Sequence, residues 1–122
     1  MKFNIYAVRI FSLNWTRSLA FYKDTIGLPV KFENADMGWA EFDLGGASLG
    51  LEQATPSDDD SEHLVGRFVG LSLQVDDIDA VYQQLTGAGV EFKGPPARQP
   101  WGGVLAHFID PDDNVITLLG TA

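Results

Sequence analysis

The sequence contains no cysteine, which excludes disulfide bonds, thiolate metal sites and a cysteine nucleophile. Basic residues are also scarce, because 8 lysines and arginines stand against 17 aspartates and glutamates, giving a formal net charge of −9 at pH 7. Nonspecific nucleic-acid binding depends on cations that neutralise phosphates, so this charge argues against a nucleic-acid partner. Only two histidines are present, His63 and His107, which limits the candidates for metal ligands and general acids.

Long apolar runs are missing as well. No stretch approaches the roughly 20 apolar residues of a membrane-spanning helix, so we expect no membrane segment. Asn4 and Arg9 interrupt the apolar N-terminal stretch and no cleavage site follows it, so we expect a cytoplasmic protein without a signal peptide. With 122 residues, 45% of them hydrophobic, the chain is long enough to fold as one domain around a core.

What the sequence does contain is one pattern of elements that occurs twice. Period-two and period-3.6 hydrophobic patterns predict a strand, a helix and three strands at residues 4–12, 17–25, 29–33, 38–44 and 47–53. The same order is predicted again at residues 67–75, 78–86, 90–93, 104–109 and 115–119. Gly27 and Gly89, which are 62 positions apart, end the two predicted helices. The repeat indicates an internal duplication and an α+β fold, with one helix on one face of each sheet.

Residues 54–66 separate the two copies and are polar and acidic, which favours an exposed linker in which His63 is solvated. The acidic triplet at 58–60 lacks the alternating ligands and the closing glutamate of a calcium-binding EF-hand loop, so we expect no calcium site there. We therefore predict one domain over residues 1–122, made of module one (1–53), an acidic linker (54–66) and module two (67–122).

Three stretches of the chain resemble the vicinal oxygen chelate superfamily, which includes glyoxalase I, bleomycin-resistance proteins and extradiol dioxygenases. They are RSLAFY at 17–22 with IGLPV at 26–30, VDDIDA at 75–80 with GAGV at 87–90, and WGG at 101–103 with FIDPD at 108–112 and Asn114. Asp113 stands where the family's last turn usually has glycine, and the acidic residues of this turn are expected to be structural. The resemblance covers almost the whole chain and implies two βαβββ modules whose mixed sheets curl around a cavity.

Metal-dependent members of that superfamily place one ligand on the first and the last strand of each module. In this sequence those positions fall on Ala7, Gly50, Gly70 and Thr117, none of which is a standard histidine or carboxylate ligand. Glu52 shares a strand face with Gly50, but one carboxylate alone would not hold a divalent ion. The resemblance therefore implies no metal site and no cofactor.

Strand alternation predicts which side chains face the cavity. The candidate ligand-binding residues share this inward position or lie at the cavity mouth, and they are Arg9, Phe11, Trp39, Glu41, Glu52, Gln74, Trp101 and His107. Arg9 either pairs with Glu41 or Glu52 or binds a ligand anion, because an inward arginine is costly without a partner.

His107 has two interpretations that the sequence leaves open. It lies ten residues before Thr117, and the resemblance places a cavity tyrosine of extradiol dioxygenases at that spacing. The imidazole either bonds a side chain on a neighbouring strand or serves a ligand pocket, since it titrates near neutral pH. In the second case Glu41 or Glu52 could be its partner.

Two functions follow. The first is a metal-independent binding protein resembling the bleomycin-resistance proteins, a homodimer that sequesters a planar or cationic small organic ligand between aromatic side chains. The alternative is a glyoxalase-like lyase or isomerase, or another enzyme of the superfamily, that uses His107 with a carboxylate. We favour binding, because enediolate chemistry needs a Lewis acid for which the four positions supply no ligands.

Overall fold

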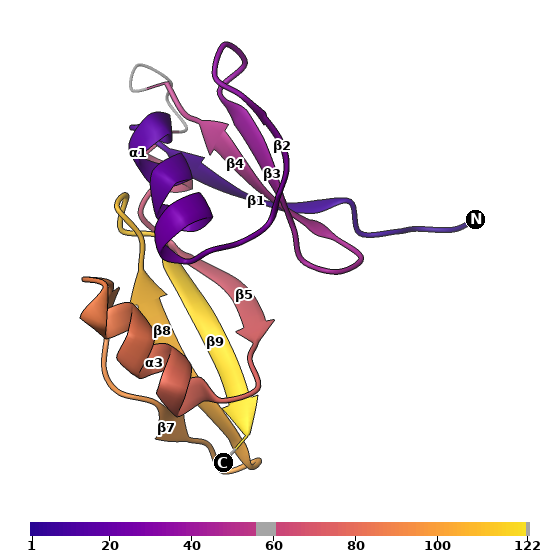
Figure 1. Ribbon diagram of the computed structural model, residues 1–122. Helices are drawn as coiled ribbons and strands as arrows, with labels where there is room; N and C mark the ends of the chain where they lie inside the picture. The colour runs from indigo at the N-terminus through magenta and orange to yellow at the C-terminus, as the bar shows by residue number, and fades with distance from the viewer. Residues whose placement is uncertain (56–60, 122) are drawn as a thin grey trace. The chain divides into compact units, whose positions relative to one another are not determined.

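The computed structural model describes residues 1–55 and 61–121 and divides the chain into two units, Met1–Gly66 and Arg67–Ala122 (Figure 1). Each unit holds one copy of the predicted repeat, and the division falls at the end of the predicted linker. Both units are mixed α+β, with a sheet that is not closed and a helix on one of its faces.

Unit 1 forms a four-stranded sheet in the order β1-β4-β3-β2, in which β1 runs parallel to β4 and the other pairs are antiparallel. Its elements are β1 (Ala7–Ser12), α1 (Trp15–Ala20), the π-helical turn η1 (Phe21–Thr25), β2 (Val30–Asn34), β3 (Trp39–Asp43) and β4 (Ser48–Gln53). Gly45 and Gly46 both have positive φ and lie in the turn between β3 and β4.

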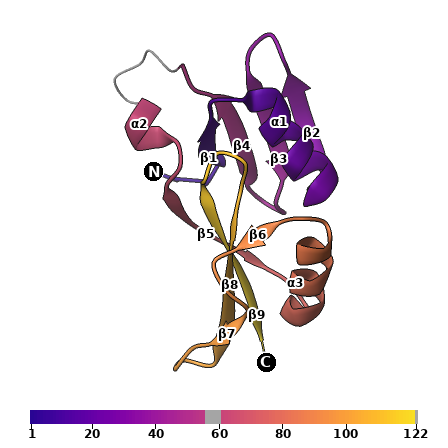
Figure 2. The same cartoon turned by 90° about the vertical axis from the view of Figure 1, so that its left-hand side faces the viewer.

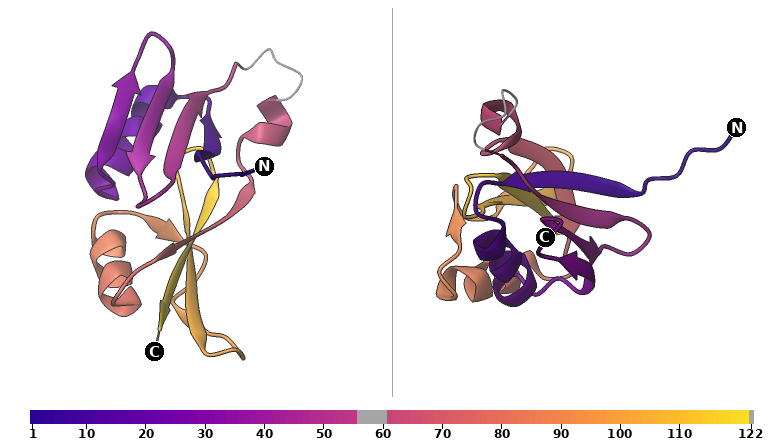
Figure 3. Two further views of the ribbon diagram at one scale, coloured as in Figure 1. Left: turned by 90° about the vertical axis from the view of Figure 1, so that its right-hand side faces the viewer. Right: turned by 90° about the horizontal axis from the view of Figure 1, so that it is seen from above.

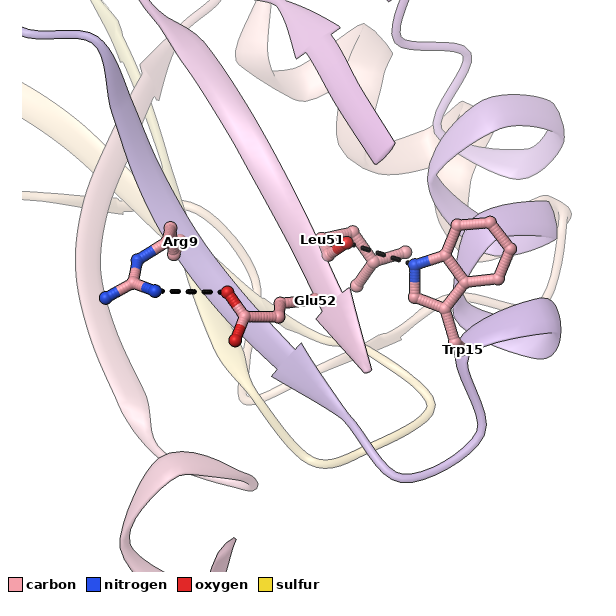
Figure 4. A network of polar contacts seen from close by, with 4 residues as sticks. All are labelled: Arg9, Trp15, Leu51 and Glu52. Carbon is pink, nitrogen blue, oxygen red and sulfur yellow. Dashed lines mark hydrogen bonds and ion pairs between the residues drawn. The ribbon is translucent and has the colours of Figure 1, made fainter. Parts of the chain in front are cut away.

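The helix of unit 1 begins two residues before its predicted start, because the side chain of Asn14 accepts a hydrogen bond from the backbone N–H of Arg17 and caps it. It changes to a π-helical turn after Ala20 and ends before Gly27, whose φ is +82°. The helix lies along one face of the sheet (Figure 2), and it covers a core that is fully buried at Phe42 and Leu51. The Trp15 indole donates a 3.0 Å hydrogen bond to the Leu51 carbonyl and ties α1 to β4 (Figure 4).

The first strand is shorter than predicted, since it begins at Ala7 and not at residue 4. The strand that pairs with β1 is β4, which begins at Ser48. The N–H of Ser48 donates a hydrogen bond to the carbonyl of Tyr6, so the residues before Tyr6 lie beyond the end of β4. Residues 1–6 lead away from β1 without a strand assignment (Figure 3), and the side chains of Phe3 and Tyr6 are exposed.

Unit 2 repeats the topology, with the order β5-β9-β8-β6 and β5 parallel to β9. Its elements are β5 (Phe68–Gln74), α3 (Ile78–Gly87), β6 (Glu91–Phe92), β7 (Ala97–Arg98), β8 (Gly103–Ile109) and β9 (Val115–Thr121). In both units the first strand pairs with the last, so the two units have the same strand topology. Strand β7, a two-residue partner of β8, was not predicted because it is too short to show an alternation.

The core of unit 2 lies between α3 and strands β8 and β9, and Phe108 and Ile116 are fully buried in it. The last turn is organised by the buried carboxylate of Asp110, whose Oδ1 accepts from the N–H groups of Asp112 and Asn114. Asp113 adopts a φ of +65°, the conformation for which glycine is usual, so the acidic residues of this turn are structural as expected.

The predicted linker contains one short helix. Part of it forms the four-residue helix α2 (Ser61–Leu64), which carries an exposed His63. The acidic triplet at 58–60 lies outside the described residues. No helix in the described ranges is long and apolar enough to cross a membrane.

Candidate functional site

In unit 1 the predicted residues lie on one face of the sheet, opposite α1. Strand register places Arg9, Gly50 and Glu41 side by side across β1, β4 and β3. The next row along the strands is Phe11, Glu52 and Trp39. The fold thus brings five of the eight predicted residues together on one face of one sheet, as their alternation predicts.

Arg9 pairs with Glu52 and not with Glu41. Its Nη1 lies 3.0 Å from Oε1 of Glu52 (Figure 4), and its guanidinium carbon lies 5.4 Å from the ring centroid of Phe11. The two charged side chains keep 57% and 37% of their surface exposed, so the pair adds little stability. The ion pair matters for ligand binding, because the positive charge of Arg9 is already balanced by the carboxylate of Glu52.

Glu41 has a different environment, since the whole residue is only 7% exposed. Its Oε2 accepts a 3.3 Å hydrogen bond from the Trp39 indole, whereas no donor among the described residues bonds Oε1. The indole crosses the sheet directly over Gly50, where an added Cβ would lie 2.4 Å from Cη2 of the ring. Glycine is therefore required at position 50 for Trp39 to reach the carboxylate.

Tyr6 is a member of this site that sequence patterns did not indicate, because it precedes the strand. Hydrogen bonding to the Glu41 carboxylate, with smaller effects of desolvation and of its negative charge, raises the pKa of Tyr6 above 10.0. Tyr6 is itself 67% exposed.

In unit 2 the face opposite α3 is built from β5, β9 and β8, and it carries no carboxylate in its central row. That row consists of Ser72, Thr117 and His107, paired across the three strands. Nδ1 of His107 lies 2.8 Å from Oγ1 of Thr117, and the ring of Phe68 packs edge-on against the imidazole with centroids 6.0 Å apart. Of the two interpretations of His107, the structure shows the bond to a side chain on a neighbouring strand.

Beside this row lies a hollow of about 360 Å³, which is within the size range of small-molecule sites. Its wall is the indole of Trp101, which is 65% exposed and lies over Gly103 so closely that an added Cβ would be 2.0 Å from Cζ3. The hollow is lined by Gln74, Trp101, Gly102, Gly103, Leu119 and Gly120. Gln74 and Trp101 were predicted, whereas Leu119 was missed although it follows Thr117 at the same two-residue spacing.

A second hollow of about 170 Å³ lies between β8 and the segment that connects β6 to β7, and His107 and Lys93 are among its lining residues. His107 and the pair Gln74 and Trp101 therefore border different hollows of unit 2.

The four positions at which the resemblance places metal ligands lie within these faces. Ala7 is paired with Ser48, and Gly50 with Arg9 and Glu41. Thr117 is bonded to His107, and Gly70 has a φ of +78° where the register of β5 against β9 shifts. Over residues 1–55 and 61–121 no group of three or more histidine, aspartate or glutamate side chains is placed to hold a metal ion.

The chain matches the family Glyoxalase/Bleomycin resistance protein/Dioxygenase superfamily over residues 5–118, which spans both units. The protein belongs to this superfamily. The family resemblance of the sequence motifs is thereby confirmed, together with the fold class.

Similar proteins are known in several bacteria. The uncharacterized protein YraH of Bacillus subtilis (strain 168) is 32% identical over 120 residues, which cover 91% of this chain and 93% of YraH. A superfamily member from Sphaerobacter thermophilus DSM 20745 has a solved structure that is 31% identical, with a TM-score of 0.80 and 98% of each chain covered. TnmS3, an antibiotic binding protein from Streptomyces sp. CB03234, is 28% identical, with a TM-score of 0.80 and coverage of 99% of this chain and 98% of TnmS3.

Proposed function

We propose that this protein is a metal-independent binding protein that sequesters a planar or cationic small organic molecule against its exposed aromatic side chains. The observation that carries the proposal is the hollow of about 360 Å³ in unit 2, where the largely exposed ring of Trp101 stands over Gly103. An exposed indole beside a hollow of this size offers a flat, apolar surface on which a planar ligand can stack.

The remaining lining of the hollow suits such a ligand. Leu119 adds apolar surface, and the exposed Gln74 side chain makes no hydrogen bond within the described part of unit 2. Its amide offers both a donor and an acceptor to the polar edge of a heteroaromatic ring. These features support recognition by stacking with one directional polar contact.

Two further observations support binding as the function. TnmS3 is an antibiotic binding protein, so an antibiotic is one class of ligand for this chain and antibiotic resistance is one role for it. The net charge of −9 raises the local concentration of cations near the surface. We include in the proposal that the protein is cytoplasmic and works as a homodimer.

An enzymatic role is the competing hypothesis. A histidine that acts as general acid or base is commonly oriented by a carboxylate, whereas His107 is hydrogen-bonded to the hydroxyl of Thr117. A hydroxyl partner does not stabilise an imidazolium as a carboxylate would, which favours binding over acid–base catalysis.

The test uses the three tryptophans of the chain, whose indole N–H groups give three separate signals in a ¹H–¹⁵N NMR spectrum. Neutral planar phenazine is the probe, and we expect it to shift the Trp101 signal and to quench tryptophan fluorescence. Substitution W101A should weaken binding by about five- to 150-fold, since stacking on an aromatic ring is worth about 1–3 kcal/mol.

The matched control is F3A, which removes another exposed aromatic ring from a part of the chain outside the hollow. It should leave phenazine affinity unchanged. Equal binding by wild type and W101A would contradict the proposal, as would conversion of a bound carbonyl or glutathione adduct at a rate abolished by His107→Ala.

A further inference from the structure

Glu41 in unit 1 is a buried polar group whose hydrogen bonding is incomplete. The residue is 7% exposed, one carboxylate oxygen accepts from the Trp39 indole, and the other has no hydrogen bond among the described residues. Buried polar atoms are nearly always hydrogen-bonded, and an unsatisfied one lowers the free energy of unfolding. A cost of this kind calls for a compensating role.

Neither of the two ion pairs found in the described part of unit 1 includes Glu41. Arg9, the cation on the same face, is paired with Glu52 at 3.0 Å, and Lys23 is paired with Glu33 at 3.2 Å. Trp39 supplies an N–H donor but no charge. Among the residues that the structure describes, the carboxylate of Glu41 is thus hydrogen-bonded to Trp39 but forms no ion pair.

The groups next to Glu41 suit an organic cation. The indole of Trp39 covers Gly50 and borders the carboxylate, so a ligand nitrogen that donates to Oε1 would lie near an aromatic ring. The carboxylate offers such a nitrogen a charge-assisted hydrogen bond, and the indole beside it offers apolar surface to the rest of the ligand. Tyr6, whose hydroxyl lies near this carboxylate, belongs to the exposed segment before β1.

We propose that Glu41 and Trp39 form a binding site for the positively charged nitrogen of an organic cation, an amidinium, guanidinium or ammonium group, with the nitrogen donating to Oε1 of Glu41. The inference deepens the proposed function, on which its biological meaning rests, because it names the charge and the chemical group of the ligand. The site is formed by residues of unit 1, whereas the hollow beside Trp101 is lined by residues of unit 2.

The experiment titrates the full chain with benzamidinium and follows the Trp39 indole signal, which is assigned by its disappearance in W39F. We expect this signal to shift on saturation, while the signal of buried Trp15, bonded to the Leu51 carbonyl, stays in place and reports an intact fold. Neutral benzamide, which has nearly the same shape, should bind at least about tenfold more weakly, as a charge-assisted hydrogen bond predicts.

Two variants separate a local contact from the general field of an acidic protein. E41Q keeps the shape and an acceptor for Trp39 but removes the charge, and it should weaken benzamidinium binding by at least about tenfold. D43N removes one negative charge from the same face of the same strand, where Asp43 bonds the N–H of Gly45, and it should change the affinity less than about twofold.

The inference is overturned if saturating benzamidinium leaves the Trp39 signal unmoved, or if E41Q and D43N weaken binding equally. Its failure differs from failure of the proposed function. If phenazine shifts the Trp101 signal while benzamidinium leaves Trp39 unaffected, the binding function stands and the cation site falls. If benzamidinium binds at Trp39 and phenazine does not bind, the planar-ligand proposal falls and the cation site stands.

Discussion

The two units share a strand order but differ in the chemistry of the face that their helix leaves uncovered. In each unit a tryptophan lies over a glycine of the sheet, Trp39 over Gly50 and Trp101 over Gly103. The ring in unit 1 is half-buried and bonded to a carboxylate, whereas the ring in unit 2 is 65% exposed and borders a hollow. The two units therefore share one feature, a tryptophan ring that lies over a glycine, but the polar groups next to the ring differ.

The difference extends to the polar groups at the centre of each face. In unit 1 the buried carboxylate of Glu41 has one oxygen without a hydrogen bond, while in unit 2 His107 and the buried Thr117 satisfy each other at 2.8 Å. An unsatisfied group costs stability and a mutually satisfied pair contributes to it. The two faces therefore differ in how completely their central polar groups are hydrogen-bonded without a ligand.

The largest effects are expected where a methyl group is placed beneath each ring. In G50A the new Cβ would lie 2.4 Å from Trp39, which is held by its bond to Glu41, and we expect the free energy of unfolding to fall by about 1–3 kcal/mol, as for other overpacked sites. In G103A the exposed Trp101 can swing outward, so the loss should stay below about 1 kcal/mol while phenazine affinity falls. Urea unfolding and phenazine titration measure the two effects.

Equal losses of stability in G50A and G103A would contradict the conclusion that Trp39 is held in place and Trp101 is free to move. The comparison between the rings would sharpen if G103A bound phenazine as weakly as W101A, since both substitutions act on the same ring.

Smaller and opposite effects are expected at the polar centres. Thr117→Val removes the partner of His107 and should lower the free energy of unfolding by about 1 kcal/mol. E41Q replaces a buried charge that lacks a full set of hydrogen bonds, and it should raise the same quantity by up to about 1 kcal/mol, although it removes the proposed cation site. Parallel urea titrations at pH 7 measure both variants, and a destabilised E41Q would show that the carboxylate is satisfied in solution.

The smallest effect concerns Tyr6. Because hydrogen bonding to the Glu41 carboxylate and its charge raise the pKa of Tyr6 above 10.0, E41Q should lower the pH at which one of the three tyrosines ionises. The stability contributed by this contact is present below pH 10.0 and is lost at higher pH, since the unfolded chain then releases the tyrosine proton first. Tyrosinate absorbance against pH, with Y6F identifying the residue, measures the shift, and identical curves for wild type and E41Q would contradict it.

Much of the fold and of the faces followed from local patterns in the sequence. Period-two alternation placed Arg9 and Phe11 on one face of β1, and the spacing of apolar residues with Gly27 and Gly89 located both helices. Alternation depends only on the extended backbone, in which successive side chains point to opposite faces, so it survives without knowledge of the partner strand. Sequence patterns did not predict the short or irregular elements, which are β7, α2 and the π-helical turn η1.

The pairing of the site residues could only be decided by the tertiary structure. Sequence patterns left Arg9 free to pair with Glu41 or Glu52, and the register of β1 against β4 and β3 together with side-chain direction selected Glu52. The same holds for the bond between His107 and Thr117, whose strands meet in antiparallel register. Face is a local property of a strand, whereas contact depends on register, rotamer and burial, which segments distant in the sequence determine jointly.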